Sequence, residues 1–195
     1  MSLMGTFPGR LPGPGRVHRL AIPGGLGGVR RTLQVMVDVA STFKCDLHVR
    51  TLAVCLVGGR IVTLSNGSQV RYPLCRPKDY EAELRCLHAF CRDHVRYVRD
   101  IEGVETLQTP IQTLNVLAGD CDDKSMLFCA LAGAIGFPTR YRAIGVRGEP
   151  FSHVTGQAYL DEVGFVNAET ILTDPPVELG WEPPDATVEM TASCQ

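Results

Sequence analysis

Apolar residues in the first two thirds of the chain recur at steps of three and four, the spacing of one face of an α-helix. This pattern is most regular at Tyr80, Leu84, Leu87, Cys91 and Val95. Breaks at Gly and Pro divide the pattern into five predicted helices, at about residues 33–40, 46–57, 77–94, 110–117 and 121–136. The last of these is apolar along most of its length, which predicts a buried helix.

The hydrophobic period changes after Pro138, and β-prone runs follow. Three strands are predicted, at residues 139–146, 152–160 and 165–170, with turn residues between them. A separate hairpin is predicted at residues 61–74, because Asn66-Gly67 lies between two β-prone runs. Helices followed by antiparallel strands indicate an α+β fold.

Local composition divides the chain into four segments. Residues 1–30 are rich in Pro and Gly and are expected to form an extended basic arm, and residues 31–76 an N-terminal extension of helices plus a hairpin. Residues 77–184 hold the predicted core. Residues 185–195 are expected to form an irregular, acidic tail.

The composition excludes several classes of protein. With 195 residues, 45% of them hydrophobic, the chain can form one domain with a sizeable core. No apolar run is long enough for a membrane span, and the Pro-broken N-terminus does not resemble a signal peptide. The formal net charge of −2 argues against nucleic acid or a membrane surface as a partner.

The charges are unevenly distributed. Residues 1–31 contain five arginines and no acid, whereas residues 161–195 contain eight acids and no Lys or Arg. Such ends could steer the chain onto another copy of itself or onto other charged subunits. They could equally be solvated ends without a partner.

The eight cysteines include no CxxC pair, so a structural zinc site is not supported, and no metal or organic cofactor is expected. Candidates for disulfide bridges are Cys45, Cys55, Cys75 and Cys194. Buried free thiols are expected at Cys86, Cys91 and Cys129, which lie on predicted helices. The four histidines other than His153 are scattered without metal-ligand spacing and are interpreted as structural.

Candidate chemistry centres on Cys121, at the predicted start of the buried helix. The positive end of a helix dipole favours a thiolate, but the neighbouring Asp120, Asp122 and Asp123 would raise the pKa of the thiol. The site therefore requires a nearby cation, which His153 could supply as an imidazolium.

Glu169 lies sixteen residues after His153, on the adjacent predicted strand. Cross-strand neighbours approach within about 5.5 Å, so the Glu169 carboxylate could hydrogen-bond the His153 imidazole and fix its tautomer. The three side chains would then form a Cys–His–acid triad.

Four segments in this order resemble the transglutaminase-like superfamily, over about residues 77–184. They are Gly119-Asp120-Cys121-Asp122-Asp123, Gly136-Phe137-Pro138-Thr139-Arg140-Tyr141-Arg142, Phe151-Ser152-His153-Val154 and Phe165-Val166-Asn167-Ala168-Glu169-Thr170. Upstream, residues 95–100 and 107–110 are similar to versions encoded by phages and prophages. The resemblance implies a papain-like fold, with the nucleophile at a helix N-terminus packed on a small antiparallel sheet.

The resemblance also implies a role for each matching residue. Cys121 matches the nucleophile and His153 the general base, while Glu169 stands where the family usually has Asp. Asp122 and Asp123 match the family's acidic pair and are expected to cap the helix. Gln108 and Asn115 are polar candidates for helping to stabilise an oxyanion.

Two functions follow as hypotheses. In the first, the chain is an acyl-transfer enzyme: water as acceptor gives a protease or amidase, the commoner outcome in microbial relatives, and an amine gives a crosslinker. In the second, a neck, tail or capsid-associated component of a phage particle uses the fold as scaffold. The phage resemblance predicts assembly in the bacterial cytoplasm and a place in the virion, with a cytoplasmic protein as the alternative.

Overall fold

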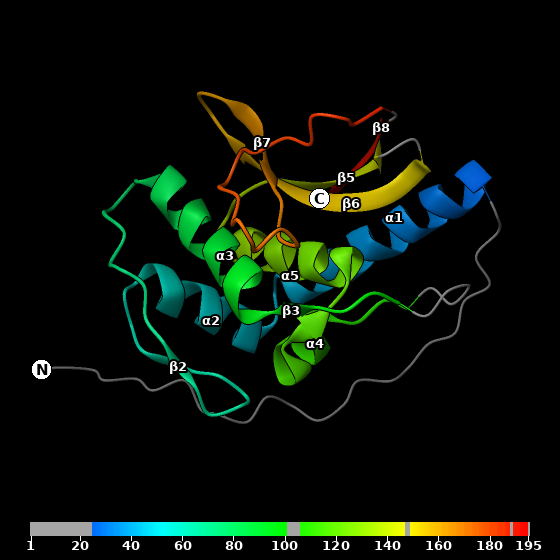
Figure 1. The fold of residues 1–195 in the computed structure, drawn as a ribbon. Coiled ribbons are helices and arrows are strands. Elements are labelled where there is room, and N and C mark those ends of the chain that lie inside the picture. The colour runs from blue at the N-terminus through cyan, green and yellow to red at the C-terminus, as the bar shows by residue number, and fades with distance from the viewer. Residues whose placement is uncertain (1–24, 101–105, 147–148, 188, 195) are drawn as a thin grey trace, which may run out of the picture.

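The computed structural model describes residues 25–100, 106–146, 149–187 and 189–194. Helices come first along the chain: α1 (Gly25–Phe43), α2 (Leu47–Val57), α3 (Tyr80–His94), α4 (Pro110–Val116) and α5 (Cys121–Ala134). Most of the sheet follows: β5 (Thr139–Val146), β6 (Glu149–Leu160), β7 (Gly164–Ala168) and β8 (Glu189–Cys194). This order confirms the predicted α+β class (Figure 1).

The four late strands form one antiparallel sheet in the order β7-β6-β5-β8. Two pairs of two-residue strands lie apart from it. One is the predicted hairpin, β1 (Val62–Thr63) with β2 (Gln69–Val70); the other pairs β3 (Arg96–Tyr97) in parallel with β4 (Ala118–Gly119). In the second pair, β4 ends two residues before Cys121.

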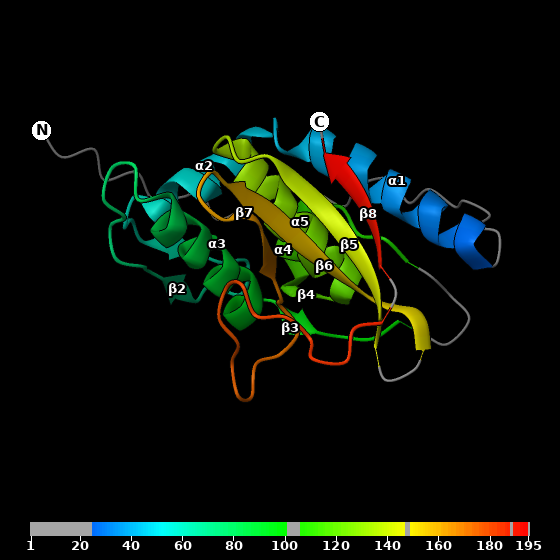
Figure 2. The same cartoon turned by 90° about the horizontal axis from the view of Figure 1, so that it is seen from above.

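Helix α5 is the central element of the core. Figure 2 shows β5 and β6 passing over it, and the other four helices also contact it. Met126, Leu127, Phe128 and Leu131 are fully buried, as expected for a helix that is apolar on all sides. A single hydrophobic cluster runs from α1 to Leu179, so the predicted extension and core share one interior.

The first helix is longer than the sequence pattern indicated. Leu33, Met36, Val37 and Ala40 form its buried face, but the helix begins already at Gly25. The prediction of an extended arm is therefore wrong for residues 25–30, and residues 1–24 of the arm lie outside the described part of the chain. Gly28 is buried and Val29 is half-buried, so packing against the protein accompanies this first turn despite its glycines.

The end of the chain also differs from the prediction. Residues 189–194 are not irregular: they form strand β8, which pairs with β5 from Ile144↔Glu189 to Thr139↔Cys194. Alternate residues of β8 are half-buried, and Met190, Ala192 and Cys194 pack against the core. A long-range backbone pairing supplies this strand, and no strong local signal marks it in the sequence.

The structure refines the predicted starts of α2 and α3. Asp79 caps α3, so Pro77 precedes the helix rather than opening it; Asp46 caps α2 through its hydrogen bonds to the backbone of His48 and Val49. Within the described residues, no helix combines the length and apolar character that crossing a membrane requires.

Candidate active site

The first residue of α5 is Cys121, and the helix start is held by Asp120. The Asp120 side chain accepts a hydrogen bond from the Asp123 backbone N–H at 3.0 Å, which makes Asp120 the N-cap. The expectation that Asp122 and Asp123 cap the helix is therefore wrong. Serving as a cap, Asp120 fixes the direction in which the chain enters α5 and so the position of Cys121.

Asp123 joins α5 to the preceding loop. Its carboxylate accepts from the backbone N–H and the side-chain Nε2 of Gln108, both at 2.6 Å. Burial raises the pKa of Asp123 to about 6, against the effect of these hydrogen bonds. Because the Gln108 amide is engaged by Asp123 and the Ala118 carbonyl, it is not directed to an oxyanion as predicted. Asn115 lines the pocket that is described below.

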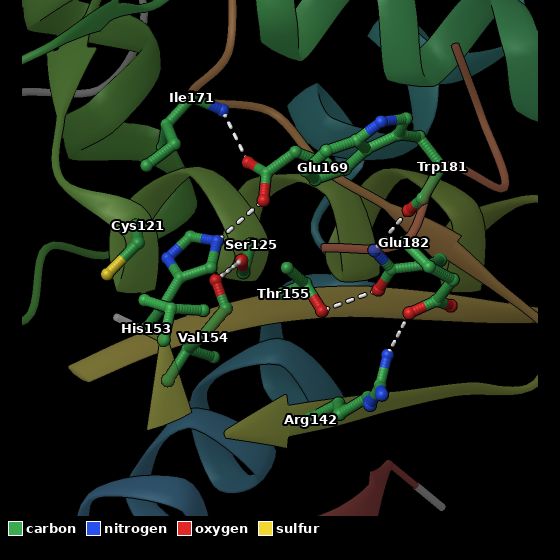
Figure 3. Close-up of polar contacts among 12 residues, drawn as sticks. Cys121, Ser125, Arg142, His153, Val154, Thr155, Glu169, Ile171, Trp181 and Glu182 are labelled. Carbon is green, nitrogen blue, oxygen red and sulfur yellow. Dashed lines mark hydrogen bonds and ion pairs between the residues drawn. The ribbon is translucent and has the colours of Figure 1, made fainter. Parts of the chain in front are cut away.

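His153 and Glu169 form a buried pair across the sheet. The His153 Nε2 lies 2.6 Å from Oε2 of Glu169, whose Oε1 accepts from the Ile171 backbone N–H at 2.8 Å (Figure 3). The predicted strand 165–170 contained Glu169, whereas β7 ends at Ala168, so Glu169 lies one residue past the strand. With Nε2 donating to the carboxylate, Nδ1 is the ring nitrogen that lies toward Cys121 in Figure 3.

The Glu169 carboxylate is held in its ionised form. Burial acts to raise its pKa, but the hydrogen bond and charge of His153 outweigh burial and lower it. The acid–imidazole half of the predicted constellation is thus assembled in the structure.

The Cys121 thiol sits in an environment that disfavours a free thiolate. Burial raises its pKa well above the usual value, and the charges of Asp122 and Asp120 raise it further. The thiol donates a hydrogen bond to Oδ1 of Asp122 at 3.5 Å. A thiolate here therefore depends on a neighbouring positive charge, and His153 lies beside Cys121 in Figure 3.

His88 was interpreted as a structural residue at a helix edge, but it contacts the candidate site from inside the core. It is 1% exposed, and its Nε2 lies 2.5 Å from the backbone carbonyl oxygen of Glu169. Burial lowers the pKa of His88, which favours a neutral ring that donates from Nε2. The spacing of Leu84, His88 and Cys91 places it on the apolar face of α3 and could have revealed its burial.

Lys124 is a second buried residue that the sequence analysis did not single out. It has no exposed surface, and its Nζ donates to the carbonyl oxygens of Val95 at 2.5 Å and Arg92 at 3.5 Å. Those carbonyls end α3, so Lys124 ties α5 to α3 three residues after Cys121. A lysine inside an otherwise apolar helix is the signal that could have found it.

Further hydrogen bonds fix β6 next to α5 and β7. The Ser125 hydroxyl donates to the Val154 carbonyl at 3.2 Å, and Thr155 donates to Asn167 at 2.6 Å. Asn167 donates onward to the Trp181 carbonyl at 2.8 Å, so the segment after β7 is fastened to the sheet (Figure 3). His153 and Glu169 lie between these contacts on rigid elements.

All eight cysteines carry free thiols, including the four that were candidates for bridges. Two pairs of thiols are in side-chain contact, Cys75 with Cys86 and Cys129 with Cys194. Each pair combines a bridge candidate with a cysteine expected to be a buried free thiol. Among the described residues, no three His, Cys, Asp or Glu side chains are grouped as a metal site would require.

Comparison with known proteins bears on family and fold. The family model of the transglutaminase-like superfamily matches residues 74–170. No curated protein is significantly similar to the chain.

Two solved structures have similar chain traces. A candidate cysteine protease from Cytophaga hutchinsonii is 18% identical with a TM-score of 0.44, over 75% of this chain and 47% of that protein. The chain thus spans about half the length of the Cytophaga protein. LapG of Legionella pneumophila in its calcium-bound form is 15% identical with a TM-score of 0.48, over 80% of each chain.

The family match begins before α3 and ends one residue after Glu169, so it contains Cys121, His153 and Glu169. It also contains the caps and the central helix that place them. Residues 74–170 of this chain therefore form a domain of the transglutaminase-like superfamily.

Proposed function

We propose that this protein is a cysteine-dependent acyl-transfer enzyme in which Cys121 is the nucleophile, His153 the general base and Glu169 the residue that orients His153. The observation that supports this most strongly is the buried hydrogen bond of 2.6 Å between His153 Nε2 and Glu169 Oε2. That bond directs Nδ1 to the side of Cys121. The roles of these three residues rest on this geometry together with the family match.

In the proposed reaction, His153 takes the thiol proton while the Cys121 sulfur attacks an amide carbonyl carbon. The C–N bond breaks, the leaving amine takes the proton from His153, and a thioester remains on Cys121. Attack of water, deprotonated by His153, breaks the thioester and releases the acid. The positive end of α5 favours the negative charge that develops beside Cys121, whereas Asp120 and Asp122 oppose it.

A pocket of about 770 Å³ offers room for the substrate. It is lined by β3, by the ends of α3 and α4, and by the Ser65–Asn66 turn and Thr173. Tyr97, a lining residue, is close enough to Cys121 that, after burial, the thiolate charge is the largest cause raising its pKa. We propose that the substrate chain lies along β3 and delivers its amide bond to Cys121.

Hydrolysis is the outcome we propose, which makes the protein a protease or amidase. Water is a sufficient acceptor, so the reaction requires one substrate site rather than two. Incubation with a peptide substrate and a fluorescent alkylamine separates the alternatives: release of free acid supports hydrolysis, and amine incorporated into the peptide would replace it with crosslinking.

A second candidate, a structural component of a phage particle with little or no catalysis, is favoured by the environment of the thiol. Burial and two aspartates hold the pKa of Cys121 high, and its hydrogen bond goes to Asp122. The phage origin rests on the sequence resemblance alone. Mass spectrometry of purified particles tests it: absence of the chain would remove the virion role and leave a cytoplasmic enzyme.

The charged ends remain candidates for contacts with other subunits, but several acids of the C-terminal segment already form ion pairs within the chain. Glu182 and Glu189 form ion pairs with Arg142, and Glu178 lies 3.4 Å from Arg85. Because these acids face arginines of their own chain, we propose that any assembly depends chiefly on the basic segment before α1.

Alkylation with iodoacetamide at about pH 5.5 tests the proposed enzyme, because an ordinary thiol with a pKa near 8.5 is almost entirely protonated there. The wild-type protein should be labelled at Cys121, and Cys121→Ala should lose that labelling. Cys45→Ala is the matched control, because it removes an exposed thiol elsewhere. An unlabelled wild type, or equal labelling of Cys121→Ala, would overturn the nucleophile and support the scaffold.

A further inference from the structure

Two thiols far from Cys121 meet between α5 and the last strand. Cys194 ends β8, where it is opposite Thr139 of β5. Cys129 lies in α5, and its Sγ reaches the carbonyl oxygen of Arg140, the next residue of β5, at 3.7 Å. Both sulfurs therefore lie at the start of β5, and their side chains are within hydrogen-bonding contact of each other.

The two sulfurs differ in access. Cys129 is buried under the sheet, where a Cβ added to Gly156 would lie only 3.0 Å from its Sγ. Cys194 is only partly buried, on the edge strand. Cys194 is thus the more accessible of the two thiols, and Cys129 is shielded from solvent.

The surroundings also make the two sulfurs chemically unequal. The thiol of Cys129 hydrogen-bonds Cys194 and lowers the pKa of Cys194 to about 7, against burial and with help from Thr139 and Tyr141. Burial raises the pKa of Cys129 well above the usual value. Cys194 is therefore the better nucleophile of the pair near neutral pH.

We propose that Cys129 and Cys194 form an oxidisable dithiol, with Cys194 the peroxide-reactive sulfur and Cys129 the sulfur that resolves it to a disulfide. The Cys194 thiolate attacks a peroxide oxygen, the O–O bond breaks, and hydroxide leaves from a Cys194 sulfenic acid. The Cys129 sulfur then attacks the Cys194 sulfur, and the S–O bond breaks. Water leaves with the Cys129 proton, so two thiols are oxidised and one hydrogen peroxide becomes two waters.

The disulfide would join the helix that carries Cys121 to the edge strand that closes the sheet. Cross-linking residues 129 and 194 closes a long loop and restricts the unfolded chain. It would also prevent β8 from separating from β5 without global unfolding. The site is independent of the proposed acyl-transfer reaction, since neither sulfur contacts His153 or Glu169 in any described interaction.

The protein's tryptic map makes the test direct. Cleavage after Lys124 and Arg140 yields a peptide of residues 125–140 whose only cysteine is Cys129; cleavage after Arg147 yields residues 148–195, whose only cysteine is Cys194. The folded, reduced full-length chain is treated with an equimolar amount of hydrogen peroxide, blocked with an alkylating agent and digested without reductant. We expect the two peptides to be joined, with the loss of two hydrogen atoms.

Two variants test the order of the steps. In Cys129→Ser, dimedone should trap a sulfenic acid on Cys194; in Cys194→Ser, the linked peptides should be absent and Cys129 should stay reduced. Oxidation should raise the melting temperature of the wild type by about 5–10 °C. The melting temperatures of the two variants should not change on oxidation. Peptides 125–140 and 148–195 that remain unlinked in oxidised wild type would overturn the proposal, as would trapping on Cys129 rather than Cys194.

Discussion

The Nε2 atom of His88 lies 2.5 Å from the backbone carbonyl oxygen of Glu169, while the Glu169 carboxylate lies 2.6 Å from His153. Glu169 thus forms one hydrogen bond with His88 through its backbone and another with His153 through its side chain. The Ile171 N–H holds the remaining carboxylate oxygen. Glu169 is therefore fixed at three atoms, and α3 supports the orientation of His153 from the far side of the core.

Replacing His88 by Leu should keep the volume of the buried side chain but leave the Glu169 carbonyl without its donor. An unsatisfied buried carbonyl costs about 1–3 kcal/mol, so we expect the free energy of unfolding to fall by that amount in urea denaturation. His88→Gln, which retains a side-chain N–H, should recover part of the loss. Equal stability of His88→Leu and wild type would show that the contact has no energetic weight.

Replacing Glu169 by Gln should slow alkylation of Cys121. The variant keeps the shape of the side chain but removes the charge from the buried hydrogen bond that orients His153 beside Cys121. Hydrogen bonds to charged groups contribute about 1.5–3 kcal/mol, which corresponds to a rate about 10–150 times lower at pH 6. Glu169→Asp keeps the charge on a shorter side chain and should fall between the two.

The same pair predicts a dependence of stability on pH. The pKa of Glu169 is lowered in the folded state, since His153 outweighs burial. Its contribution is therefore present above the pKa of an unfolded Glu and is lost as pH falls through the lower, folded value. The difference in unfolding free energy between wild type and Glu169→Gln should shrink steadily on acidification below about pH 4. A constant difference would contradict the assigned ionisation of Glu169.

Lys124 should make the stability of the protein rise with pH in mildly alkaline solution. Burial lowers the pKa of Lys124 to about 8, so between there and the unfolded value, about 10.4, only the unfolded chain holds the proton. Stability then rises with pH across this window, by at most about 3 kcal/mol. Urea unfolding of wild type and Lys124→Met at several pH values from 7.5 to 10 measures the effect.

The comparison with Lys124→Met isolates this term because all other titrating groups are shared. The lost hydrogen bonds to Val95 and Arg92 lower the stability of the variant by an amount that does not depend on pH. The effect of the buried amine is measured by the difference between the two proteins in the slope of unfolding free energy against pH. Parallel stability curves for the two proteins would mean that Lys124 titrates normally.

Elements with a strong local pattern could be predicted from the sequence. Strand β5 was predicted with the bounds that the structure has, because Thr139–Val146 is β-prone and is preceded by Pro138. The start of α5 at Cys121 could be predicted because Gly119-Asp120 breaks the preceding helix. The hydrogen bond between His153 and Glu169 followed from their places on consecutive antiparallel strands.

What the sequence did not reveal depends on partners distant in the chain. The segment of β8 follows a Pro-rich stretch and contains Met, Ala, Ser and Cys, so only its pairing with β5 makes it a strand. The role of Gln108 is set by Asp123, fifteen residues away, which occupies the amide that was expected to face an oxyanion. The Glu169 carbonyl that receives His88 lies 81 residues from it, beyond any local pattern.

Strand β8 has a consequence for the order in which the molecule is completed. The first described helix, α1, contacts this last strand, and α1 also packs on α5 and β5 (Figure 2). During synthesis, residues 121–170 emerge well before residues 189–194, so the outer edge of β5 stays open while the site residues are already present. Contacts between elements so far apart in the chain slow folding, and an unpaired strand edge invites association. The vulnerable interval is therefore the time between the emergence of β5 and the emergence of β8.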